Sequence, residues 1–112
     1  MPHIELRVSP NLSGRVDAAG LLKKLVARLS EFETVSPASV KAYQLHLDAY
    51  AMGENAPNGF IHVKASILSG RDLETRRAMA AALHELVRQE AEPHGAGASV
   101  ELCEMDRETY FK

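Results

Sequence analysis

The sequence predicts an α+β fold in which two β-α-β units form a four-stranded mixed sheet with two helices on one face. Three observations lead to this prediction. Polar and apolar residues alternate near the N-terminus, and a β-rich segment follows residue 59, as is typical of half-buried strands. Apolar residues recur at helical spacing in two longer segments that follow these strands. A shift of 57 residues brings the two halves into register, which indicates an internal repeat of about 2–52 and 59–105.

The first unit opens with a strand over 3–8, whose apolar residues Ile4, Leu6 and Val8 share one face. Asp17 is a plausible N-cap for the helix that follows. The apolar stripe of this helix comprises Leu21, Leu22, Leu25, Val26 and Leu29. After a loop around 35–37, residues 40–50 are extended in character, with Tyr43, Leu45 and Leu47 on one face.

The segment 53–59, rich in Gly, Pro and Asn, separates the units. The second unit has a strand over 60–68, a turn at 69–71 and a helix that Asp72 caps and that runs to about residue 90. The apolar stripe of this helix comprises Leu73, Met79, Ala80, Leu83, Leu86 and Val87. A loop over 93–97 then leads to a last strand over 100–105.

The repeat matches residue by residue in the strands. Adding 57 to Ile4, Leu6 and Val8 gives Ile61, Val63 and Ala65, and the same shift takes Leu45 to Leu102. Each unit needs a parallel crossover because its helix lies between its strands. Both helices then lie on one face of a single domain over 1–112, and a partner subunit is the economical cover for the other face.

Composition excludes several classes of protein. The formal net charge of −2 and the pI near 6.2 give no basic field for nucleic acid. No apolar run is long enough to span a membrane, and the N-terminus lacks the features of a signal peptide. The single cysteine, Cys103, fits a reducing compartment, so we expect a cytoplasmic protein. His46 and His62 lack a third ligand, and we expect no metal site.

Pro2 is unusual by its position. Removal of Met1 would expose a secondary amine at the start of a strand. Nearby cations or desolvation would lower the pKa of this amine toward neutrality, and a neutral amine near pH 7 is a competent general base. By position alone, however, Met-Pro is a common way for a protein to begin.

The ordered set of motifs resembles the tautomerase superfamily and, within it, the 5-carboxymethyl-2-hydroxymuconate isomerase family. The resemblance covers about residues 1–90. It rests on Met1-Pro2-His3 with its strand, on the segment 45–52 (LHLDAYAM) and on the segment 60–63 (FIHV). The best match is the turn 69–76 (SGRDLETR), which is similar to the Gly-Arg-Ser-Leu-Glu-Ser-Arg turn of the family.

The resemblance implies a homotrimer, an N-terminal proline that acts as base and acid, and cations that bind substrate carboxylates. Pro2 carries over as the catalytic residue, and Arg71 carries over from the turn as a substrate-binding residue. Lys41 stands where the family has an Arg, so it keeps the charge and loses the bidentate fork. Tyr43 stands at a further family Arg.

These features together predict an isomerase that moves a proton across three atoms of an unsaturated 2-hydroxy or 2-oxo polycarboxylic acid. The resemblance implies 5-carboxymethyl-2-hydroxymuconate, an intermediate of homoprotocatechuate catabolism. We expect no cofactor, because a conjugated carbonyl already stabilises the developing charge. Two alternatives stay open: a tautomerase acting on another small oxo acid, and a catalytically silent trimer that binds a ligand or a protein.

Overall fold

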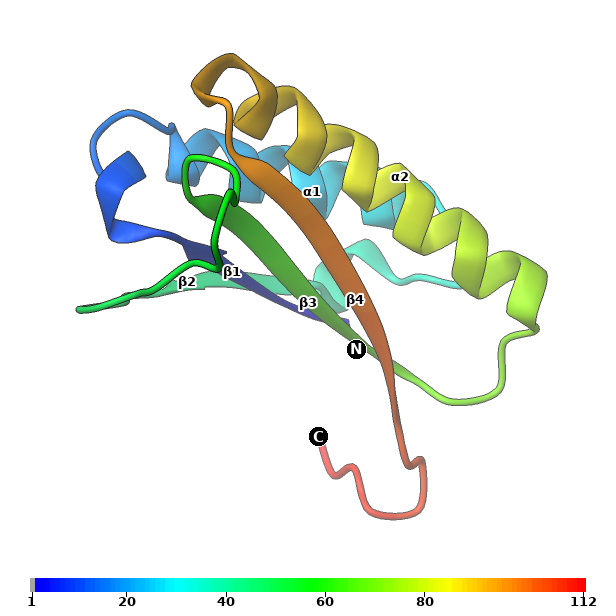
Figure 1. Cartoon of the computed structure of the whole chain (residues 1–112). Coiled ribbons are helices and arrows are strands. Elements are labelled where there is room, and N and C mark those ends of the chain that lie inside the picture. Colours follow the sequence, from blue (N-terminus) through cyan, green and yellow to red (C-terminus); the bar gives the residue numbers. More distant parts are fainter. Residues whose placement is uncertain (1) are drawn as a thin grey trace.

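The computed structural model of the chain describes residues 2–112, and its elements follow the order β-α-β-β-α-β (Figure 1). The strands are β1 (His3–Val8), β2 (Lys41–Leu45), β3 (Phe60–Leu68) and β4 (Gly97–Met105). The two α-helices are α1 (Ala18–Ser30) and α2 (Leu73–Ala91). Short 3-10 helices lie at Pro10–Leu12, Pro37–Ser39 and Glu92–His94.

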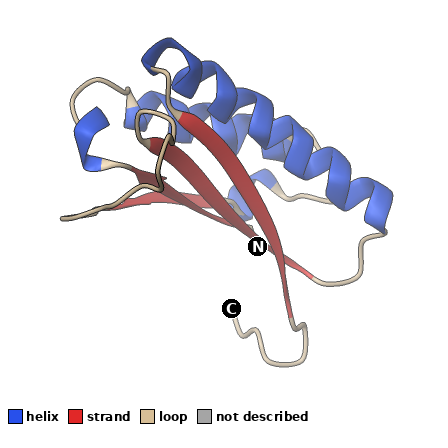
Figure 2. Cartoon of the chain, viewed as in Figure 1, coloured by secondary structure: helices blue, strands red, loops and turns tan. Residues whose placement is uncertain are grey.

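The four strands form one sheet in the order β2-β1-β3-β4. Each unit is internally parallel, because β1 pairs with β2 and β3 pairs with β4 in the same direction. The central pair, β1 with β3, is antiparallel. Both helices lie on one face of this sheet, and its other face is left open (Figure 2). The predicted fold class is therefore confirmed.

The core lies between the sheet and the helices. Alternate residues of β1 and β3 point toward the helices and are buried, as the period-two pattern predicts. The helices contribute residues three or four positions apart, which form one stripe on each. The fully buried side chains on these four elements include Ile4, Leu6, Ile61, Val63, Ile67, Leu21, Leu25, Leu29, Met79, Leu83 and Val87.

Both predicted helix caps form. The Gly20 amide donates to the Asp17 carboxylate at 3.0 Å, and the Thr75 amide donates to the Asp72 carboxylate at 2.7 Å. Each bond satisfies one of the amides that the first helical turn leaves without a partner. The cap at Asp72 fixes the direction of the preceding turn, which contains Arg71.

The predicted strand over 40–50 is wrong in its length, because β2 ends at Leu45. Within residues 2–112 its only partner strand is β1, and the last pair is Arg7 with Leu45. β1 ends at Val8 and a 3-10 helix begins at Pro10. In the described part of the chain, the residues after Leu45 therefore have no paired strand beside them. The length of β2 is thus set by the length of a distant segment.

The last strand is longer than the sequence predicts, since β4 begins at Gly97 and pairs along the whole of β3. The proposed match of Leu45 with Leu102 is also wrong. Leu45 is 36 % exposed on the open face of the sheet, whereas Leu102 packs against the core. A register difference of one residue exchanges the two faces of a strand.

The helix stripes need two corrections. Leu73, placed in the stripe of α2, is 52 % exposed at the first residue of the helix. The buried residues of the two helices also correspond at an offset of 58 rather than 57, as Leu21 with Met79 shows. The duplication itself stays a prediction.

Hydrogen bonds and close packing join the two units at the end of the sheet where β1 ends and β3 begins. The Ser9 side chain is buried, and its hydroxyl accepts a hydrogen bond from the Phe60 amide at 2.9 Å. The same hydroxyl donates to the Asn11 side chain at 2.6 Å. Gly59, with φ of +84°, lies directly against both side chains. This position requires glycine, both for its backbone angle and for the space.

Candidate functional site

A cleft of about 210 Å³ lies at the end of the sheet where β1 begins and β3 ends. The N-terminus, the loop after α1, the turn after β3 and the C-terminal tail meet here, and Figure 1 shows both termini near this end. Three of its lining residues are cations and none of them has an acidic side chain, although the chain carries a net charge of −2. The lining residues are Pro2, Thr34, Ser36, Ser39, Leu68, Arg71, Arg107 and Lys112.

Pro2 is buried in the wall of this cleft. Its carbonyl oxygen accepts a hydrogen bond from the Lys41 amide at 3.0 Å, which extends the parallel pairing of β1 and β2 by one bond. The position of Pro2 is therefore held by the sheet itself. Met1, whose removal would free the Pro2 amine, lies outside the described residues.

Arg71 is the most firmly held cation of the cleft. Its Nε donates to Thr34 Oγ1 at 2.8 Å, and its Nη2 donates to the Thr34 carbonyl at 2.9 Å. Its Nη1 donates to the Leu68 carbonyl at 3.2 Å. A guanidinium has five N–H donors, so these bonds leave two free to meet an anion. Partial burial, and then the positive charge of Arg107, lower the pKa of Arg71.

Arg107, which the sequence analysis did not single out, is the second guanidinium in the cleft. It belongs to the tail after β4, and its Nε donates to the Ser69 carbonyl. A signal for it was present in the sequence. Parallel pairing of β3 with β4 sets Leu68 beside Met105, so the residues after 105 must lie near the turn at 69–71.

Lys41 is not among the residues that line the cleft. Its main chain contacts Pro2, but its exposed side chain stands at a register position opposite His3, on the open face of the sheet. Tyr43 lies on the same face, and its hydroxyl donates to Glu5 at 2.9 Å. Partial burial and the bond to Glu5 raise the pKa of Tyr43. The geometry thus joins Pro2 with Arg71 and leaves Lys41 on a different surface.

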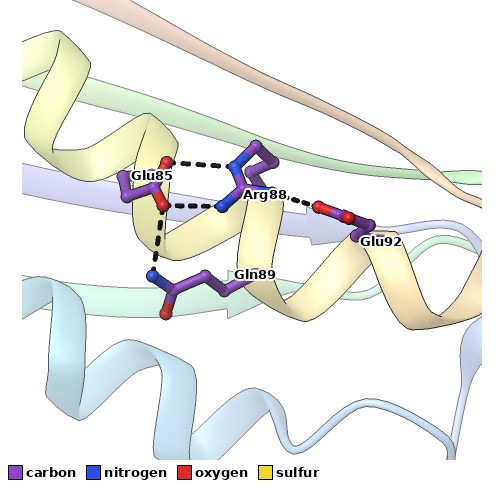
Figure 3. A network of polar contacts seen from close by, with 4 residues as sticks. All are labelled: Glu85, Arg88, Gln89 and Glu92. Atoms are coloured by element: carbon purple, nitrogen blue, oxygen red, sulfur yellow. Dashed lines mark hydrogen bonds and ion pairs between the residues drawn. The ribbon is translucent and has the colours of Figure 1, made fainter.

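The cleft arginines differ from an arginine on the outer surface of α2. Arg88 forms ion pairs with Glu85, at 2.7 Å, and with Glu92, and Gln89 also donates to Glu85 (Figure 3). Among residues 2–112, by contrast, no carboxylate forms an ion pair with Arg71 or Arg107. The positive charge of the cleft is therefore not neutralised by side chains of the described chain.

The two histidines considered as metal ligands are separate. His62 contacts the Ser99 hydroxyl at 2.6 Å on the open face, and His46 lines a second cleft of about 190 Å³ at the opposite end of β1. In the part of the chain that the structure describes, no three His, Cys, Asp or Glu side chains gather as metal ligands. Nor does any helix within residues 2–112 have the length and apolar character needed to cross a membrane.

Solved structures with the same architecture define the class of the fold. A 5-carboxymethyl-2-hydroxymuconate isomerase from Deinococcus radiodurans R1 is 24 % identical, with a TM-score of 0.80 over 99 % of this chain and 87 % of that chain. A 5-carboxymethyl-2-hydroxymuconate delta-isomerase is 16 % identical, with a TM-score of 0.78 over 100 % and 87 %. A wild-type fused 4-OT, described as a symmetric trimer, is 20 % identical, with a TM-score of 0.67 over 94 % and 86 %. The fold is that of the tautomerase superfamily.

The sequence itself then gives the family. The family model of 5-carboxymethyl-2-hydroxymuconate isomerase matches residues 2–112, and the chain belongs to this family. Comparison with curated proteins gave no match. Membership supports an isomerase of the tautomerase superfamily, which agrees with the resemblance seen in the sequence.

Proposed function

We propose that the protein catalyses a 1,3-proton shift in an unsaturated 2-hydroxy or 2-oxo polycarboxylic acid, with 5-carboxymethyl-2-hydroxymuconate as the substrate. The observation that carries the proposal is the placement of Pro2 and the cations Arg71 and Arg107 around one cleft. A secondary amine beside paired cations suits a substrate that carries both an enol proton and carboxylates.

In the proposed reaction, the neutral Pro2 amine takes the proton of the 2-hydroxyl group. The O–H electron pair becomes the C=O bond, and the electrons of the adjacent C=C bond form a C–H bond at C3 with the proton that the prolinium returns. The proton has then moved from oxygen to carbon across three atoms. Atoms and electrons balance, so neither oxidant nor reductant is needed. Arg71 and the other cations favour the neutral amine in the free enzyme and stabilise the negative charge of the dienolate.

In the proposed homotrimer, the side chain of Lys41 would lie at the contact between subunits rather than in the cleft of its own chain. Its side chain lies on the open face of the sheet, where we propose that neighbouring subunits of a homotrimer pack. The exposed apolar residues Tyr43, Leu45, Tyr50 and Met52 follow β2 and the segment after it, and they support burial against a partner. Light scattering should give three times the chain mass of 12.3 kDa. A mass near that of one chain would contradict the trimer.

The test of the chemistry begins with the N-terminus. Mass spectrometry of protein from its native host should show Met1 removed, because a retained Met1 converts the amine to an amide. Ultraviolet assay of 2-hydroxymuconate ketonisation should then show a loss of about 10²–10⁴-fold in Pro2→Ala. Pro93→Ala, at an exposed position in the 3-10 helix Glu92–His94, is the matched control and should retain activity. Full activity in Pro2→Ala would refute the proposed role.

A tautomerase that acts on a smaller oxo acid is the second candidate. It is favoured by Tyr43, which bonds to Glu5 on the open face and supplies no cation where the family has one. A panel of dienols with one, two and three carboxylates separates the two substrates. The highest kcat/KM on a monocarboxylate would favour the smaller acid.

A further inference from the structure

The guanidinium of Arg107 is held in the cleft by contacts with the turn at 69–71. Gly70 has φ of +123°, and the place where a Cβ would stand is 3.5 Å from Arg107 Nε and 3.6 Å from its Nη2. The guanidinium therefore lies against the bare α-carbon of the turn, with its Nε bonded to Ser69. A side chain at position 70 would be strained by this backbone angle, and its Cβ would lie in ordinary contact with the guanidinium.

The tail that carries Arg107 is fastened to the sheet next to Pro2. The Tyr110 hydroxyl and His3 Nε2 are 2.6 Å apart, and the two rings meet edge to face at 5.7 Å. The Tyr110 amide donates to the Asp106 carbonyl at 3.0 Å, which closes the tail into a turn around Arg107. These contacts hold the guanidinium at the cleft although the residue itself is exposed.

Both arginines line the same cleft and keep unused N–H donors. Among the described residues, Arg107 bonds only through Nε, so both of its Nη groups stay free, and Arg71 keeps two N–H donors. Two adjacent guanidinium groups repel each other unless an anion lies between them. A carboxylate, which accepts paired N–H bonds from a guanidinium, satisfies both.

We propose that Arg107 is a substrate-binding residue, and that it and Arg71 together bind a single carboxylate group of the substrate. This inference rests on the proposed function and adds a residue of the C-terminal tail to its site. The pair selects substrates that carry a carboxylate at this end of the cleft. It contributes to binding in the ground state, so its loss raises KM more than it lowers kcat.

Binding of glutarate, a saturated dicarboxylate that cannot isomerise, tests the subsite without catalysis. Calorimetry on the full chain should show affinity reduced about tenfold or more in Arg107→Met, because a charge-assisted bond pair is lost. The glutarate affinity of Arg107→Lys should lie between that of the wild type and that of Arg107→Met. Arg77→Met, which removes the same charge from the exposed side of α2, should bind as the wild type does.

Tyr110→Phe changes no charge and removes only the hydroxyl contact to His3. A loss of glutarate affinity in this variant therefore also supports the view that the tail positions Arg107 for binding. Glutarate affinity in Arg107→Met within twofold of wild type overturns the proposal, as does an equal loss in Arg77→Met. Kinetics separate this inference from the proposed function. Turnover with an unchanged KM in Arg107→Met overturns the subsite alone, whereas intact glutarate binding without any turnover overturns the isomerase alone.

Discussion

Replacement of Gly59 by Ala tests the junction between the two units. Gly59 has φ of +84°, a backbone angle that costs a side-chain-bearing residue about 1–2 kcal/mol. The added Cβ would also overlap Ser9 Oγ and stand 2.5 Å from Asn11 Oδ1. To make room, the buried Ser9 hydroxyl must move and lose its bond with the Phe60 amide, which costs about 1–3 kcal/mol more. The expected loss in the free energy of unfolding is about 2–5 kcal/mol.

Gly14→Ala is the matched control. Gly14 has nearly the same angle, φ of +78°, and among residues 2–112 no atom beyond its two chain neighbours lies within 4 Å of its added Cβ. Only the conformational cost of about 1–2 kcal/mol therefore applies to it. The difference between the two variants isolates the steric cost at Gly59 and cancels the shared backbone effect.

Urea unfolding followed by circular dichroism measures both values. All proteins must be compared at one concentration, because any subunit association makes the apparent stability depend on it. Gly59→Ala should be less stable than Gly14→Ala by at least about 1 kcal/mol. Equal stabilities would refute the reasoning, because they would mean that the Ser9 hydroxyl adapts without cost.

Two further predictions concern α2. Leu83→Ala should lower the free energy of unfolding in urea by about 2–5 kcal/mol, because the side chain is fully buried. Leu73→Ala should lower it little, because Leu73 is 52 % exposed. Similar losses in the two variants would contradict this assignment of the buried stripe. Hydrogen bonds from Arg88 and Gln89 lower the pKa of Glu85 to about 2, from an ordinary value of 4.5. Its carboxylate therefore stabilises the fold above pH 4.5, and this contribution is lost as the pH falls toward 2. The small difference in Tm between wild type and Glu85→Gln should shrink over that range in scanning calorimetry, and a constant difference would exclude the effect.

The patterns that predicted the fold are local. Alternation along 3–8 and helical spacing along 21–29 depend only on neighbours in sequence, and both patterns match the buried faces. The errors concern distant partners. Leu45 ends β2 close to the point where β1 ends, and its match with Leu102 is wrong by one residue of register. Leu73 follows the helical pattern but lies at the end of α2, where it is half exposed.

The candidate site was partly visible for the same reason. Pro2 and Arg71 stand out by their position and their turn, and the structure places them in one cleft. Arg107 belongs to no motif, and the parallel pairing of β3 with β4 indicates only that the tail begins near the turn at 69–71. The further course of the tail includes a contact between Tyr110 and His3, 107 positions apart in sequence. Lys41 has the right charge, yet its side chain lies on the open face because strand residues alternate between faces.

The antiparallel pairing of β1 with β3 has a consequence for how chemistry is divided between the halves. Under the predicted offset of 57 residues, the counterpart of Pro2 is Gly59, and the counterpart of Arg71 is Gly14. Both counterparts lie at the end of the sheet opposite the cleft, where Ser9 bonds to Phe60 and Gly14 lies beside the end of β1. That end therefore has neither an amine nor a guanidinium at these two positions. In the proposed reaction, the first half of the chain would supply the base and the second half the anion-binding groups, so neither unit would carry a site that works alone.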